Sequence, residues 1–126
     1  MKLSLNKEER NKVILDVLCN GAIGFLEQSG VEMTYSDQDY KKTRVKGDCY
    51  EDVLLKILNS GGKLEFIDNE GDESKTLTDE VLTKALTNIE NQDFADYVIT
   101  LLKEEGDAET GLCVLQFILY DEVIFG

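Results

Sequence analysis

The most apolar stretch of the chain lies near its end and shows no polar face. Within residues 112–120 only Gln116 is polar, so neither a helix nor a strand there could turn a hydrophilic side to water. An element of this kind has to lie in the interior. Asp107 suits an N-cap and Glu109 a first helical turn, which predicts a central helix over residues 107–126. The many β-forming residues leave a buried strand as the alternative.

Four earlier segments place apolar residues three or four positions apart, which is typical of amphipathic helices. Residues that can cap a helix mark where they begin, and small or polar residues mark most of their ends. The predicted starts are Asn6 with Glu9 and Asp48 with Glu51, where the glutamate completes a capping box, then Thr78 and Asp93. The first two helices are expected to end at Asn20-Gly21 and at Gly61 or Gly62, the third turns Ile89 inward, and the fourth ends at Glu105.

Short segments bounded by turn residues predict strands between these helices, and in residues 31–35 and 63–68 apolar and polar residues alternate. The expected strands are Ile23–Glu27, Val31–Tyr35, Tyr40–Lys46 after a turn at Ser36-Asp37-Gln38, Lys63–Asp68, and Glu73–Leu77. The last two are expected to pair across the turn residues 69–72. Together the pattern predicts one α+β domain over residues 1–126. Four or five helices pack on a small, mainly antiparallel sheet of short strands, with the apolar C-terminal helix in the core.

The net charge of −13 is unevenly distributed along the chain. Residues 1–64 hold ten acidic and ten basic side chains, whereas residues 65–109 hold fourteen acidic side chains against three lysines, a net charge of −11. A protein that binds nucleic acid directly shows the opposite sign, so we expect neither DNA nor RNA as a direct ligand. A field of this sign attracts a basic partner.

Composition also argues against catalysis. The chain contains no histidine, which removes the commonest general base, the usual zinc ligand and the middle member of a Ser-His-Asp triad. The carboxylates gather in turns and at helix ends, and no pair stands out as an acid and a base in an apolar cleft. No glycine-rich phosphate loop is present in the sequence. We therefore expect a non-enzymatic protein that needs no cofactor.

The three cysteines, Cys19, Cys49 and Cys113, are odd in number and far apart in the sequence. This pattern predicts free, buried thiols rather than a disulfide or a metal site, and it fits a reducing compartment. No basic start followed by an apolar run suggests a secretion signal, and no apolar run is long enough to cross a bilayer. We expect a cytoplasmic protein that does not bind metal and does not enter a membrane.

One basic cluster interrupts this acidic chain. Lys41, Lys42, Arg44 and Lys46 all fall on the predicted strand Tyr40–Lys46. Charged side chains commonly protect the edge of a sheet from pairing with other chains, and this is the interpretation we favour. An anion-binding site is the alternative.

Acidic residues follow one another at alternate positions after the predicted strand near residue 66, namely Asp68, Glu70 and Asp72. The spacing is that of the start of a calcium loop, but Glu73 stands where such a loop needs glycine for its sharp turn. There are two other interpretations. These residues form a solvated hairpin tip, or together with Glu73 they form an acidic face that binds a partner. Carboxylates at alternate strand positions repeat at about 6.8 Å, which is of the same order as successive phosphates.

A second acidic cluster consists of Glu104, Glu105, Asp107 and Glu109. The first two are predicted in the last turn of the helix that starts at Asp93, where the helix dipole disfavours anions by a few tenths of a kcal/mol to about 1 kcal/mol each. Anions kept at a local cost indicate a surface selected for a basic partner. Solubility alone is the alternative explanation.

The C-terminal segment DAETGLCVLQFILYDEVIFG resembles the ending of a family of small, acidic, phage-encoded proteins of unknown function. Members of this family close with a pattern similar to D-A-E-T-A-D-x-x-x-Q-x-x-x-x-G-E-V-[VI]-[FY]-G. The family's second aspartate is replaced by Leu112 and its glycine by Asp121. The matching residues are Asp107, Ala108, Glu109, Thr110, Gln116, Glu122, Val123, Ile124, Phe125 and Gly126. The part of the family that precedes this ending is also similar to residues 61–86.

This resemblance implies a phage or prophage origin and brings no known catalytic residues. Small acidic phage proteins are often inhibitors of host defence, among them anti-CRISPR proteins that occupy the positively charged nucleic-acid channel of an effector nuclease. We therefore expect a nucleic-acid mimic that acts in the host cytoplasm on a basic, nucleic-acid-binding protein. The alternative is a phage accessory or assembly protein that binds other phage proteins, and the oligomeric state stays open.

Overall fold

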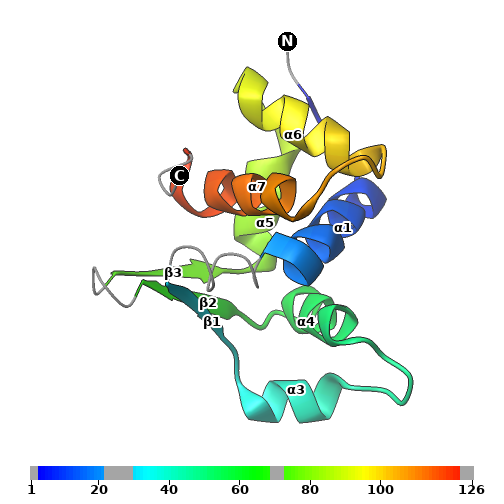
Figure 1. Cartoon of the computed structure of the whole chain (residues 1–126). Coiled ribbons are helices and arrows are strands. Elements are labelled where there is room, and N and C mark those ends of the chain that lie inside the picture. Colours follow the sequence, from blue (N-terminus) through cyan, green and yellow to red (C-terminus); the bar gives the residue numbers. More distant parts are fainter. Residues whose placement is uncertain (1–2, 22–29, 69–72, 123–126) are drawn as a thin grey trace.

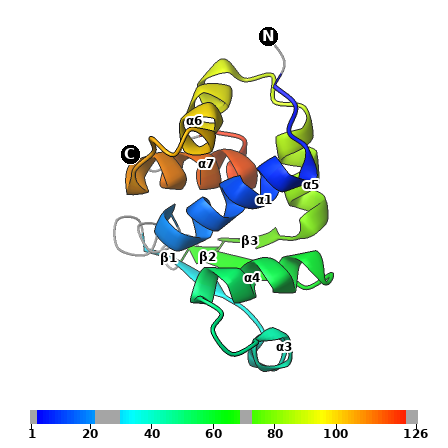
Figure 2. The ribbon, with the colours of Figure 1, turned by 90° about the vertical axis from the view of Figure 1, so that its right-hand side faces the viewer.

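The computed structural model describes residues 3–21, 30–68 and 73–122, and at residues 20, 21 and 73 it describes the backbone alone. The helices are α1 (Lys7–Asp16), α3 (Asp37–Thr43), α4 (Tyr50–Asn59), α5 (Asp79–Thr87), α6 (Gln92–Leu102) and α7 (Ala108–Tyr120), with a π-helical turn η1 (Val17–Gly21) after α1. The strands are β1 (Val31–Thr34), β2 (Leu64–Asp68) and β3 (Glu73–Leu77). Figures 1 and 2 both show α6 at the top, α1, α5 and α7 in the middle, and α3 at the bottom, with the sheet and α4 between.

The three strands form one antiparallel sheet in the order β1-β2-β3. Phe66 in the central strand pairs with Met33 on one side and with Lys75 on the other. The predicted α+β class is confirmed, and so are the strand at Val31 and the pairing of β2 with β3. The described residues form six α-helices rather than four or five. The expected strand Ile23–Glu27 and the turn at 69–72 lie outside the described residues.

Helix α7 occupies the core. Asp107 is its N-cap, and eight of its residues are buried, more than in any other helix that the structure describes. It packs against η1, α6, α5 and β3, and the buried apolar side chains of the described residues form one cluster. The segment is thus a helix and not a strand, and residues 123–126 of the prediction lie outside the described part of the chain.

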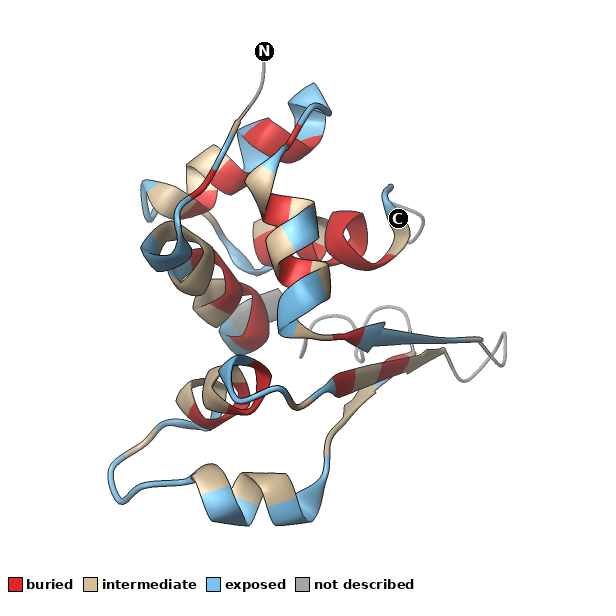
Figure 3. Ribbon diagram, turned by 180° about the vertical axis from the view of Figure 1, so that it is seen from behind, coloured by how far each residue is buried: buried red, intermediate tan, exposed pale blue. Residues whose placement is uncertain are grey.

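The predicted strand Tyr40–Lys46 is wrong, because most of it belongs to helix α3. Ser36 is not a turn residue but the N-cap, since its hydroxyl accepts a hydrogen bond from the Asp39 backbone N–H at 3.3 Å. Acidic residues occupy the first turn and lysines the last, as the helix dipole favours. All seven residues of α3 are described and none is buried, and Figure 3 shows this helix without any red segment.

Three tyrosines attach α3 to the rest of the molecule. The ring centroids of Tyr35 and Tyr40 lie 5.3 Å apart, and each lies 5.9 Å from the ring of Tyr50 on α4. Aromatic pairs at these separations stabilise beyond the area they bury. Burial, aided by a hydrogen bond with Tyr35, raises the pKa of the Tyr50 phenol. The cluster therefore compensates for the absence of a buried face on α3.

The predicted caps at Asn6 and Thr78 are confirmed, and the capping box of Asn6 with Glu9 is complete. The cap predicted at Asp48 is wrong by one residue. Its carboxylate accepts a hydrogen bond from the Val45 N–H at 2.9 Å and one from the Lys56 amine at 2.7 Å, so it belongs to the preceding turn. Cys49 is the N-cap of α4 instead.

Candidate functional site

The second predicted acidic cluster is exposed and continuous in the structure. We call residues 104–109, which carry the carboxylates of Glu104, Glu105, Asp107 and Glu109, the acidic segment. It covers most of the connection from α6 to α7 and the first two residues of α7. All four side chains are exposed. The prediction that the first two lie in the last turn of a helix is wrong, because α6 runs from Gln92 and ends at Leu102 with Lys103 as its C-cap. The helix also begins earlier than Asp93, with Asn91 as its N-cap.

Glu104 adopts the left-handed conformation, with a φ of 59°. The backbone N–H groups of Glu104 and Glu105 donate to the carbonyl oxygens of Leu101 and Thr100, at 3.0 and 3.1 Å. This is the Schellman arrangement, in which glycine usually occupies the left-handed position. A side chain there costs roughly 1–2 kcal/mol. The amine of Lys12 compensates little, since its ion pair with Glu104 at 3.5 Å is exposed.

We expect Glu104→Gly to raise the free energy of unfolding by about 1 kcal/mol, because glycine adopts this conformation without a clash. Glu104→Ala is the matched control: it removes the same carboxylate but keeps the Cβ atom, so it should bring no such gain. Urea unfolding of the three proteins measures the difference. Equal stability of the glycine and alanine variants would contradict the assignment of the cost to backbone conformation.

Two carboxylates of the acidic segment have structural roles. The Asp107 side chain accepts hydrogen bonds from the backbone N–H and the hydroxyl of Thr110, both at 2.9 Å, and so caps α7. These bonds lower the pKa of the Asp107 carboxyl. Glu109 lies in the first turn of α7, where the helix dipole favours an anion. Local structure therefore explains Asp107 and Glu109 but not Glu104 and Glu105.

Asp107 should make the free energy of unfolding depend on pH. Its folded-state pKa lies below the ordinary value of 3.8, so its contribution is complete above pH 3.8 and is lost as pH falls through the folded-state pKa. Asp107→Asn keeps a capping oxygen that does not titrate. We expect the free energy of unfolding of this variant to fall less than that of the parent between about pH 5 and about pH 3. If the free energies of unfolding of the two proteins fall in parallel with pH, this role is wrong. The pKa of Asp48 is also lowered, but Asp48 is present in both proteins and does not affect the difference between them.

The first predicted acidic cluster is only partly described. Asp68 is the last residue of β2, half-buried, and pairs with Val31 and Glu73 across the sheet. Glu70 and Asp72 lie outside the described residues, and of Glu73 only the backbone is described. In Figure 1 the end of β2 at Asp68 and the start of β3 lie at the left, whereas the connection from α6 to α7 lies at the right. Of the described residues, the end of β2 and the acidic segment therefore lie at opposite sides of this view.

The basic cluster surrounds the end of α3. Lys41, Lys42, Arg44 and Lys46 are exposed, and none forms an ion pair with a residue that the structure describes. The predicted role in protecting a sheet edge is wrong, because these residues lie on and after a helix. The lysines of α3 have a local explanation in the dipole of that helix.

The cysteines are free, but none of them is fully buried, contrary to the prediction. Cys19 and Cys49 are exposed, and Cys113 is half-buried. Burial raises the pKa of the Cys113 thiol, and local burial together with Glu51 and Asp16 raises that of Cys19, so both thiols are protonated and poorly nucleophilic at neutral pH. Within residues 3–21, 30–68 and 73–122 no group of acidic and cysteine side chains is arranged to hold a metal ion.

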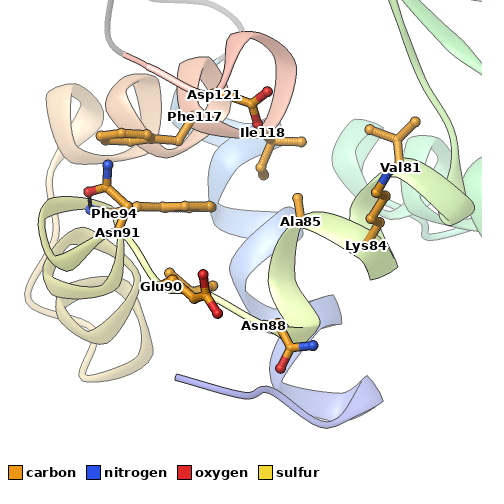
Figure 4. Close-up of a pocket in the computed structure, with 11 residues that line it drawn as sticks. Val81, Lys84, Ala85, Asn88, Glu90, Asn91, Phe94, Phe117, Ile118 and Asp121 are labelled. Carbon is orange, nitrogen blue, oxygen red and sulfur yellow. Dashed lines mark hydrogen bonds between the residues drawn. The ribbon is translucent and has the colours of Figure 1, made fainter. Parts of the chain in front are cut away.

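The sequence did not predict a groove of about 530 Å³ between α5, α6 and α7. One wall is formed by the rings of Phe94 and Phe117, which stack with centroids 4.9 Å apart and planes within 7°. Glu90, Asp121 and Lys84 also line it. In Figure 4 the two rings lie on one side, Asp121 lies near Phe117, and the Lys84 side chain extends toward Val81. No periodicity joins these residues, which are up to 37 positions apart, from Lys84 to Asp121.

Comparison of the chain with protein-family models, with curated proteins and with solved structures finds no match. The resemblance of the C-terminal segment to phage proteins therefore stays a prediction. None of the described helices is both long enough and apolar enough to span a lipid bilayer.

Proposed function

We propose that this chain is a non-catalytic, phage-derived inhibitor that binds a basic, nucleic-acid-binding protein of the host, in the manner of an anti-CRISPR nucleic-acid mimic. The partner that we expect is a protein such as a CRISPR effector nuclease, which the chain would bind in the host cytoplasm. Binding needs no cofactor, and nucleic acid is a competitor rather than a ligand.

The observation that carries the proposal is the placement of Glu104 and Glu105. Both are exposed acids outside the helix, and Glu104 is held in a backbone conformation that glycine would adopt at lower cost. Local stability thus gives no reason for a glutamate at this position, whereas binding to a cationic surface does. Asp107 and Glu109 extend the same exposed segment, so that its four carboxylates follow one another within six residues.

The charge of the whole chain supports the same partner. A net charge of −13 attracts a basic protein at long range and repels nucleic acid. A channel that holds a nucleic-acid heteroduplex is lined by positive charge, which is what an acidic surface of this kind complements.

The decisive experiment is capture of bacterial proteins on the immobilised chain at low and at high salt. We expect a basic, nucleic-acid-binding protein to be retained at low salt, to be released at high salt because exposed ion pairs are screened, and to be displaced by added nucleic acid. Retention of proteins that bind no nucleic acid, unaffected by salt or by added nucleic acid, would overturn the proposal. Preference for phage proteins would instead favour an accessory or assembly role.

A further inference from the structure

Helix α3 has the least support of the α-helices that the structure describes. None of its seven residues is buried, whereas each of the other described α-helices buries at least two. Figures 1 and 2 both show it at the bottom of the molecule, below the sheet and α4. Isolated helices shorter than about 12–15 residues are marginal in water even when they consist of good helix formers. The helical state of α3 therefore depends on what holds it to the rest of the chain.

One aromatic ring supplies the apolar contact of α3. Tyr40 is the one residue of this helix among the partly buried apolar side chains that pack against the core. Its ring meets those of Tyr35 and Tyr50, and the Ser36 hydroxyl caps the start of the helix. Every residue that becomes ordered loses backbone entropy, which these contacts have to offset. The closed position of α3 thus depends on the ring of Tyr40.

The space between α3 and the body of the molecule is not closely packed. A pocket of about 420 Å³ lies between α3 and the end of α4. A second pocket, of about 240 Å³, lies between the start of α3, the end of β1 and the start of β2, and Asp39 lines both. Protein cores leave few voids larger than a water molecule. Helix α3 therefore covers the body without being part of its core.

The chain on either side of α3 is held by other contacts. Strand β1 pairs with β2 as far as Thr34, which lies opposite Glu65. After the helix, the Asp48 N–H donates to the Val45 carbonyl at 3.0 Å, and the Asp48 carboxylate accepts a hydrogen bond from the Lys56 amine of α4 at 2.7 Å. Residues 36–44 between these points, which we call the strap, can therefore loosen without breaking the strand before it or the turn after it.

We propose that the strap opens as a unit while the rest of the described structure stays folded. In the open state α3 loses its helical hydrogen bonds, the ring of Tyr40 leaves Tyr35 and Tyr50, and the two pockets beneath the helix become one solvent-accessible surface. Segments with few buried apolar contacts are those that open locally in folded proteins. The strap is then a lid over a tyrosine-lined surface, and this inference does not rest on the proposed function.

The test is amide hydrogen exchange of the full chain, followed by two-dimensional ¹H–¹⁵N NMR. The N–H groups of Tyr40 and Arg44 donate to the carbonyl oxygens of Ser36 and Tyr40, both at 3.0 Å. We expect their protection factors to be lower than those of residues 114–118 in α7 by about a hundredfold or more. Equal protection of the two helices would overturn the proposal. Complete lack of protection in the strap would also overturn it, because the strap would then not be closed at all.

Leu115→Ala separates local opening from global unfolding. This substitution removes core contacts of α7, so it should speed exchange in α7. Exchange in the strap should stay unchanged, because opening of the strap leaves α7 folded. If the substitution speeds exchange in the strap and in α7 by the same factor, the strap opens only when the whole protein unfolds, and the proposal is wrong.

Two further variants test whether the ring of Tyr40 closes the strap. Tyr40→Ala removes the ring contacts although alanine is the better helix former, so we expect exchange of all helical N–H groups of the strap to become faster by about tenfold. Lys42→Ala is the matched control, since it truncates an exposed side chain of the same helix and should change exchange by about twofold at most. Equal effects of the two substitutions, or faster exchange confined to the residues next to position 40, would contradict opening as a unit.

Discussion

Replacing Leu115 by alanine is expected to lower the free energy of unfolding by roughly 2–5 kcal/mol. Leu115 has an exposed fraction of 0% and lies on α7, the helix with the most buried residues in the described structure. Truncation removes three methylene-sized groups from water-free surroundings and leaves a cavity, because η1 and α6 on either side of α7 are held by their own contacts.

Urea unfolding followed by circular dichroism measures this loss. Glu109→Ala is the matched control, since it truncates an exposed side chain of the same helix and should change stability by only a few tenths of a kcal/mol. If Leu115→Ala unfolds at the same urea concentration as the parent, α7 is not the centre of the core.

Neutralising the acidic segment is expected to weaken binding to the captured target by about tenfold to a hundredfold at low salt, because exposed ion pairs contribute about 0.2–1 kcal/mol each. The variant carries Glu104→Gln, Glu105→Gln, Asp107→Asn and Glu109→Gln. Folding should be retained, since asparagine can cap α7 in place of Asp107. The difference from the parent should shrink as salt rises.

The control for this variant removes four charges elsewhere. Glu8, Glu32, Asp37 and Glu80 are exposed, and their amide replacements should weaken binding far less if the acidic segment forms the interface. A third variant with amides at Asp68, Glu70, Asp72 and Glu73 tests the other predicted cluster in the same assay. An acidic-segment variant that folds and binds as well as the parent at every salt concentration would exclude mimicry by this surface.

Local signals in the sequence predicted local structure well. Asn6 with Glu9, Thr78 and Asp107 each carry a side chain that can bond to a backbone N–H three residues on, and all three cap a helix. The alternation from Leu64 to Asp68 and the turn residues that follow it in the sequence likewise predicted the β2–β3 pair. These features need only neighbours along the chain.

The wrong predictions concern features that depend on contacts between residues far apart in the sequence or on the backbone conformation of a single residue. The segment from Tyr40 follows a predicted strand and a predicted turn, so a further strand was expected. The Tyr40 ring instead meets Tyr35 and Tyr50, and a Ser36 cap together with that aromatic cluster holds the segment as a helix. The apolar run before Glu104 gives no sign that α6 stops at Leu102, because the stop depends on one residue turning left-handed. The groove between α5, α6 and α7 is lined by residues from three helices, and no local sequence pattern connects them.

The position of α7 in the sequence also affects folding of the chain during its synthesis on the ribosome. Helix α7 follows every other described element in the chain, yet it packs on η1, which begins at Val17. The apolar side chains of η1 and α6 therefore leave the ribosome before the helix that covers them has been synthesised. Folding can finish only once residue 120 has left the ribosome, and until then the nascent chain is a substrate for chaperones and proteases.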